Sequence, residues 1–192
     1  MSANELTLLE EYFDRLWPLH RSLTGKGVRD TISILKEIIP LESLEVASGT
    51  KIFDWTIPQE WVVDEAYFIG PDGKKYCDIK ENNLHLINYS EGFERTLSYE
   101  ELEPHLLTLP DSPEAIPYFT SYYSKRWAFC LKHNEKKQLP KGDYQVVIKT
   151  KFIEGSLTLS GCLLPGKSKE EILFSTYTCH PSLANNELSG PL

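Results

Sequence analysis

Residues 171–177 read Glu-Ile-Leu-Phe-Ser-Thr-Tyr, and residues 178–187 continue Thr-Cys-His-Pro-Ser-Leu-Ala-Asn-Asn-Glu. The first segment is rich in β-branched and aromatic residues, which predicts a short central strand covered on both faces. His180 then lies just beyond the carboxyl end of that strand. Ligands and metals gather at this edge of open α/β sheets, because the loops that leave the strands converge there. The stretch therefore predicts an α/β sheet with a polar site at its edge.

The loop after this strand contains residue types that bind divalent metals. Zinc takes imidazole nitrogen and carboxylate oxygen ligands, so His180 and Glu187 are the strong candidates. Asn185 and Asn186 add two neutral amides. A single histidine after a strand is more often a hydrogen-bonded structural residue than a metal ligand, so the spacing alone favours the structural interpretation.

The composition is that of a globular protein, with 192 residues of which 41% are apolar and 25% charged. The net charge is −8, from 28 acidic and 20 basic residues without a long run of either sign. This balance argues against a nucleic-acid or anionic-membrane surface. The N-terminus lacks a signal-peptide pattern and no apolar stretch is long enough to span a bilayer, so we expect a cytoplasmic protein.

Four widely spaced cysteines, without a Cys-x-x-Cys pair, predict buried free thiols in a reducing compartment.

Changes in periodicity divide the chain into three parts. Residues 1–45 contain apolar residues at helical spacing and predict two helices, which Pro18 and Pro40 end. Residues 46–140 contain short apolar runs between Pro, Gly and Asn, which predicts a β-rich domain. Within it, residues 61–78 are typical of a hairpin with its turn at 70–73.

The same middle part concentrates six aromatic residues between 118 and 131. An aromatic core of a small β domain explains that density better than a ligand-stacking surface.

Residues 141–192 predict a return to the first domain. A strand that begins at Tyr144, a turn at Glu154-Gly155 and a returning strand over 156–164 would precede the strand at 171–177.

A phosphate-loop pattern, Gly-x-x-x-x-Gly-Lys-Ser, occurs at 161–168. Pro165 removes an amide from its middle and the following residues favour a strand, so we interpret it as an exposed connection.

Four blocks of sequence together resemble a bacterial family of aminopeptidase-like proteins related to the zinc-dependent exopeptidases. They are residues 16–25 (LWPLHRSLTG), 53–61 (FDWTIPQEW), 116–123 (IPYFTSYY) and 175–191 (STYTCHPSLANNELSGP). The resemblance implies the start of a zinc-exopeptidase-like sheet with flanking helices, interrupted by a β-rich inserted domain. The changes of period near 46 and 140 fit such an insertion independently.

The resemblance also implies roles for particular residues. His180 matches the position of a zinc-binding histidine, whereas Asn186 occupies the position of an aspartate that bridges two zinc ions. A neutral amide bridges poorly, which favours one zinc ion over two. The alternatives are a site with one zinc ion or recruitment of the adjacent Glu187 as a ligand. The general base and the remaining ligands would follow Leu192, so we expect no catalytic residue within this chain and interpret it as an N-terminal fragment, inactive on its own.

Two functional hypotheses follow. The first is a metal-dependent aminopeptidase-like hydrolase that cleaves a peptide or amide substrate with metal-activated water. The alternative is a non-catalytic protein that binds a peptide or a sugar on a degenerate peptidase scaffold.

The remaining candidate residues are assigned to structure. Arg21, Thr24 and Gly25 lie in a polar loop for which an approach to the active cleft is one interpretation. A turn that caps two helices explains them at least as well, so they are left out of the catalytic set. The other histidines have no partner at ligand spacing, and we expect surface or core positions for them: His20, His85, His105 and His133.

Overall fold

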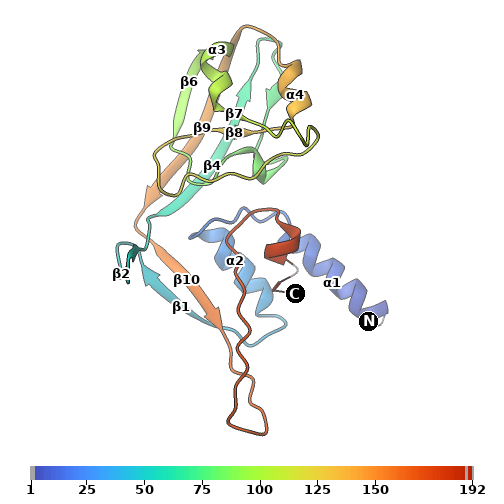
Figure 1. Ribbon diagram of the computed structural model, residues 1–192, viewed down its shortest axis with the longest axis vertical. Helices are drawn as coiled ribbons and strands as arrows, with labels where there is room; N and C mark the ends of the chain where they lie inside the picture. The colour runs from blue at the N-terminus through green and yellow to red at the C-terminus, as the bar shows by residue number, and fades with distance from the viewer. Residues whose placement is uncertain (1–2, 189, 192) are drawn as a thin grey trace. The chain divides into compact units, whose positions relative to one another are not determined.

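The computed structural model describes residues 3–188 and 190–191, apart from the side chains of residues 3–5, 185 and 186. The protein is a mixed α/β protein with several small sheets (Figure 1). It divides into two compact units. The split unit consists of residues 1–60 and 153–192, and the inserted unit consists of residues 61–152. Among the described residues, no helix has the length and apolar character that a bilayer crossing requires.

The split unit begins with the two expected helices, α1 (Ala3–Leu16) and α2 (Lys26–Leu35). Their apolar residues recur every three or four positions, so each helix presents one apolar side. Leu16 and Leu35 are buried together with Leu188, the last residue of the π-helix η3 (Ala184–Leu188). The end of the described chain is therefore anchored on the two N-terminal helices (Figure 1).

Strands β1 (Glu42–Ala47) and β10 (Ser156–Gly161) form an antiparallel pair, from Glu42 opposite Gly161 to Ala47 opposite Ser156. The sequence prediction that the segment after Gly155 folds back on the preceding strand is therefore wrong. This pairing also places both strands in the split unit. The divisions between the units consequently follow Glu60 and Phe152, whereas the sequence placed them near 46 and 140.

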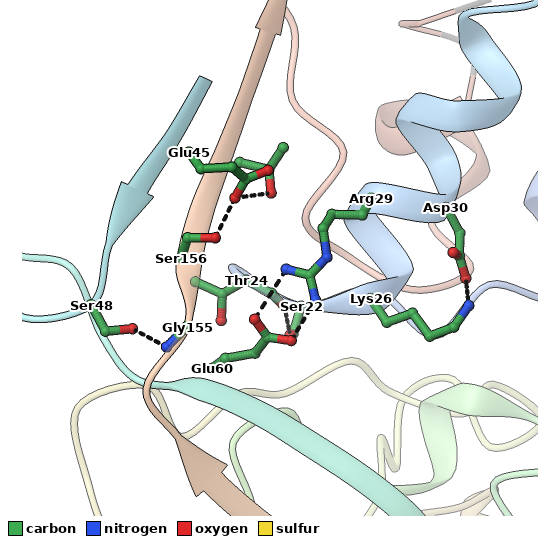
Figure 2. Close-up of polar contacts among 11 residues, drawn as sticks. Ser22, Thr24, Lys26, Arg29, Asp30, Glu45, Ser48, Glu60, Gly155 and Ser156 are labelled. Atoms are coloured by element: carbon green, nitrogen blue, oxygen red, sulfur yellow. Dashed lines mark hydrogen bonds and ion pairs between the residues drawn. The ribbon is translucent and has the colours of Figure 1, made fainter. Parts of the chain in front are cut away.

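A network of polar contacts surrounds the point where the chain leaves and re-enters the split unit (Figure 2). Arg29 donates two hydrogen bonds to the buried carboxylate of Glu60, at 2.6 and 3.0 Å. Ser48 Oγ accepts a hydrogen bond of 3.1 Å from the amide of Gly155. A Cβ at Gly155 would lie 2.5 Å from Glu60 Oε2, so only glycine fits beside this ion pair. A short hairpin, β2 (Lys51–Ile52) and β3 (Trp55–Thr56), precedes Glu60.

The inserted unit contains a four-stranded sheet in the order β5-β4-β9-β6 (Figure 1). Its hairpin from β4 (Glu60–Ile69) to β5 (Lys75–Tyr76) confirms the prediction for residues 61–78, and Gly73 N donates to Gly70 O at 2.9 Å across the turn. The other elements are β6 (Phe93–Ser98), β7 (Leu106–Leu107), β8 (Phe129–Cys130), β9 (Asp143–Ile153), α3 (Tyr99–Leu102), α4 (His133–Gln138), η1 (Asn83–His85) and η2 (Glu103–His105).

Aromatic side chains form much of the core of the inserted unit. The ring of Phe68 meets Phe129 edge to face, with centroids 5.2 Å apart, and Tyr144 in the same way at 5.6 Å. The aromatic-core prediction for residues 118–131 is correct for Trp127 and Phe129, which are buried. It is wrong for Tyr123, whose surface is 84% exposed.

Residues 162–183 contain no helix or strand. The predicted central strand at 171–177 is therefore wrong for this structure, and Ile172, Leu173 and Phe174 are largely exposed. A strand needs neighbouring strands to satisfy its backbone, and no described strand pairs with this segment. The phosphate-loop pattern at 161–168 is likewise followed by no helix, as expected from its sequence.

All four cysteines are free thiols, as predicted, but only Cys77 and Cys130 are buried. Burial raises the pKa of Cys77 well above its usual value and raises the pKa of Cys130 to about 12. Cys162 is exposed. The prediction of four buried thiols is therefore wrong for Cys162.

These environments predict very different rates of alkylation, because the thiolate is the reactive form. Cys162 should react with iodoacetamide quickly, because its side chain is exposed. Cys77 and Cys130 should stay unlabelled from neutral to mildly alkaline pH, since a raised pKa keeps both thiols protonated and burial blocks access. Peptide mass spectrometry after timed labelling of the folded protein measures this. Equal labelling of all three thiols would contradict the burial described here.

Candidate metal centre

His180 and Glu187 lie together in the split unit, as the sequence predicts, and Cys179 joins them. One ligand atom from each side chain lies within 4.8 Å of the other two. His180 Nδ1 is hydrogen-bonded to Glu187 Oε1 and lies 3.6 Å from Cys179 Sγ. Imidazole, carboxylate and thiol are the three side-chain groups that zinc prefers.

The backbone after His180 produces this arrangement. Ser182 adopts a left-handed conformation, with φ of 51°, and turns the chain back on itself. The π-helix η3 follows, in which Glu187 N donates to Leu183 O at 2.8 Å. Leu188 is buried against α1 and α2, so η3 is fixed with Glu187 pointing back to His180. The predicted ligand Asn186 lies in η3, but its side chain is outside the described residues.

Glu187 is a fully buried carboxylate that is only partly satisfied. Its exposed fraction is 0%, and Oε2 has no hydrogen-bond partner among the residues that the structure describes. Leaving a buried carboxylate oxygen unsatisfied costs free energy. The site thus offers a free oxygen ligand to a cation.

Hydrogen bonds to Cys179 and Glu187 raise the pKa of His180 to about 9, against the opposing effect of burial. In this arrangement a hydrogen bond joins His180 Nδ1 and Glu187 Oε1. A divalent cation and a proton are alternative partners for such a histidine, because only the neutral imidazole binds metal. The three side chains are therefore chemically suited to bind a metal ion. The ion would have to displace the proton of the hydrogen bond between His180 and Glu187.

Arg21 supports the site from the turn between α1 and α2. Its guanidinium is fully buried, donates from Nε to His180 O at 2.9 Å, and donates from Nη1 to Leu16 O at 2.7 Å. Burial lowers the pKa of Arg21, while the nearby Glu187 and Cys179 oppose that shift. The expected turn role is confirmed for the bond to Leu16. The bond to His180 agrees with the alternative that this loop approaches the site, although the sequence did not name His180 as the partner, which lies 159 positions away.

Three of the other histidines, His85, His105 and His133, have structural partners, as expected. His85 is buried with Nδ1 2.8 Å from Cys130 O, and His105 stacks on Trp127 with ring centroids 3.7 Å apart. His133 Nδ1 lies 3.0 Å from Thr108 Oγ1. None of these three belongs to the cluster around His180.

Comparison with known proteins finds a similar solved structure that is described as a peptidase. A crystal structure of a "putative peptidase" from Clostridium acetobutylicum has a TM-score of 0.91 and 45% sequence identity, over 96% of this chain and 44% of that one. The likeness thus extends to sequence as well as fold.

Two sequence comparisons add detail. Residues 60–151, nearly the whole inserted unit, match a family described as a domain of unknown function, DUF2172. A Clostridium acetobutylicum protein described as a "Putative polysaccharide biosynthesis protein with aminopeptidase-like domain" is 48% identical over 177 residues. That alignment covers 92% of this chain and 41% of the relative. The chain therefore spans about two fifths of the length of the proteins it matches.

Proposed function

We propose that this chain contributes the first metal ligands of a zinc-dependent aminopeptidase-like hydrolase. The buried carboxylate of Glu187 beside His180, whose Oε2 has no hydrogen-bond partner within the described part of the chain, is the observation that carries the proposal. A peptide substrate is consistent with the peptidase and aminopeptidase-like descriptions of the relatives. The activity is proposed for the whole protein, because the relatives are more than twice as long as this chain.

Within this chain, His180 and Glu187 would hold one zinc ion. A zinc ion bound there would polarise the substrate carbonyl and lower the pKa of a bound water. Arg21 holds the main-chain carbonyl of His180 and so fixes the start of the ligand loop. Leu188, packed between the two helices, fixes its end. Both contacts preorganise the ligands, which metal sites require for affinity.

A second candidate is a binding protein on a peptidase scaffold, with the inserted unit as the recognition surface. Tyr123 exposes 84% of its surface and its ring lies 6.4 Å from that of Tyr122. Exposed aromatic rings suit a sugar, and one relative is described as a polysaccharide biosynthesis protein. This candidate requires no metal at His180.

The two candidates are separated by metal content, measured by elemental mass spectrometry on the whole protein, purified without added metal. We expect close to one zinc ion per chain, and its loss in His180→Ala. The control is His133→Ala, which removes a histidine outside the site and should retain the metal. Circular dichroism should confirm that both variants are folded. If neither the wild type nor the control contains metal, the hydrolase is rejected and the binding protein is favoured.

A further inference from the structure

Cys179 stands directly before His180, yet both side chains face the same site. Its Sγ lies 3.6 Å from His180 Nδ1 and 3.9 Å from Nε2. In a regular strand, successive side chains point to opposite faces. Here residues 178–183 are irregular, which allows the two neighbours to converge.

The distance from sulfur to nitrogen suits two ligands of one ion. Zinc binds thiolate sulfur at about 2.3 Å and imidazole nitrogen at about 2.05 Å, so two such ligands at tetrahedral angles lie about 3.6 Å apart. The separation of Cys179 Sγ and His180 Nδ1 is 3.6 Å. The two atoms therefore already have the spacing that a shared tetrahedral ion requires.

Charge gives a second reason for a sulfur ligand. Glu187 supplies one negative charge at the site, and position 186 is a neutral asparagine. The fully buried Arg21 adds a positive charge nearby, which makes a dication less favourable. A thiolate at Cys179 would supply the second negative charge and offset the dication.

We propose that Cys179 binds the metal ion as a thiolate, together with His180 and Glu187. This inference rests on the proposed function, since it assumes that the site binds a metal. On binding, the S–H bond of Cys179 breaks and the proton of the hydrogen bond between His180 Nδ1 and Glu187 Oε1 is also released. Both protons pass to solvent, and bonds from sulfur, nitrogen and oxygen to the metal form. The buried, unsatisfied Oε2 of Glu187 is independent support for a cation at this position.

A thiolate ligand has a consequence for metal choice. Soft sulfur favours zinc, cobalt and cadmium over magnesium and manganese, which prefer oxygen. A site with only imidazole, amide and carboxylate would discriminate less strongly. We therefore expect the protein to bind Zn²⁺ and Co²⁺ in the presence of excess Mg²⁺.

The test is a titration of the metal-free protein with Co²⁺, followed by absorption spectroscopy. A sulfur-to-cobalt charge-transfer band should appear in the near ultraviolet, together with intense visible bands of tetrahedral Co²⁺. Cys179→Ser should lose the charge-transfer band and bind more weakly by at least roughly 10-fold, the loss that even indirect supporting contacts can cause. Cys162→Ser, which removes the exposed thiol, should behave like the wild type.

The outcomes separate this inference from the proposed function. Co²⁺ bound tightly by the wild type without a charge-transfer band would overturn the Cys179 ligand and leave the metal site standing. No Co²⁺ binding by the wild type would overturn both. The wild-type spectrum is informative by itself, so the test still works if Cys179→Ser does not fold.

Discussion

Replacing Arg21 by Met should lower the free energy of unfolding of the split unit by about 3–5 kcal/mol. The guanidinium is fully buried and donates to Leu16 O and His180 O. Charge-assisted hydrogen bonds contribute about 1.5–3 kcal/mol each, and the two carbonyls would lose their donor. Glu187 would also lose a nearby buried cation, which adds to the cost. Methionine keeps an unbranched apolar stem like that of arginine but supplies no hydrogen-bond donor.

The matched control is Arg15→Met, which removes an arginine from the exposed ion pair with Glu37. Exposed pairs contribute little, so its unfolding midpoint should stay close to that of the wild type. Urea unfolding followed by circular dichroism gives the free energies. Hydrogen exchange with mass spectrometry locates the effect, which we expect in α1, α2 and η3 but not in β4 or β9. Equal stability of the two variants would show that the bonds of Arg21 are not important for folding.

Gly27→Ala should destabilise the split unit by about 3 kcal/mol, although Ala is favoured over Gly in a helix by about 1 kcal/mol. Gly27 lies in the first turn of α2, against the chain that enters the helix. A Cβ there would lie 2.2 Å from His20 O and 3.0 Å from Arg21 Cα. These are backbone atoms, so α2 or the preceding turn must move. The steric cost therefore exceeds the gain in helix propensity.

Gly166→Ala is the control for Gly27→Ala, because no atom lies within 4 Å of a Cβ at that position. We expect its stability to remain within about 0.5 kcal/mol of the wild type. Thermal unfolding monitored by calorimetry compares the two variants. In Gly27→Ala, displacement of the turn should also move Arg21 away from His180. A Gly27→Ala variant as stable as the wild type would falsify the close approach of α2 to His20.

Local signals in the sequence were sufficient for several elements. The helices α1 and α2 follow from apolar periodicity, and the hairpin from β4 to β5 follows from its turn residues. Segment 171–177 has equally strong strand composition but forms no strand. Composition describes what a segment tolerates, whereas a strand also needs a partner. The pairing of β1 with β10 was missed because it joins segments more than 100 residues apart.

In the candidate site too, the sequence predicted the residues that local signals identify and missed those that depend on the folded backbone. His180 and Glu187 are close in sequence, and ligand chemistry predicted that they act together. Cys179 was not predicted, because adjacent residues normally face apart and only the irregular backbone brings its thiol toward His180. The partner of Arg21 was not predicted for a different reason, since its contact with His180 depends on how the two halves of the split unit pack.

The close approach of Glu60 and Gly155 has a consequence for how this architecture arose. Glu60 precedes the inserted unit and Gly155 follows it, yet a Cβ at Gly155 would touch the side chain of Glu60. Two chain ends this close can be joined by a very short linker, so the intervening residues 61–152 form a module that evolution, or an engineer, can exchange without rebuilding its host. The split unit would need to keep glycine at position 155, where the chain re-enters it beside Glu60.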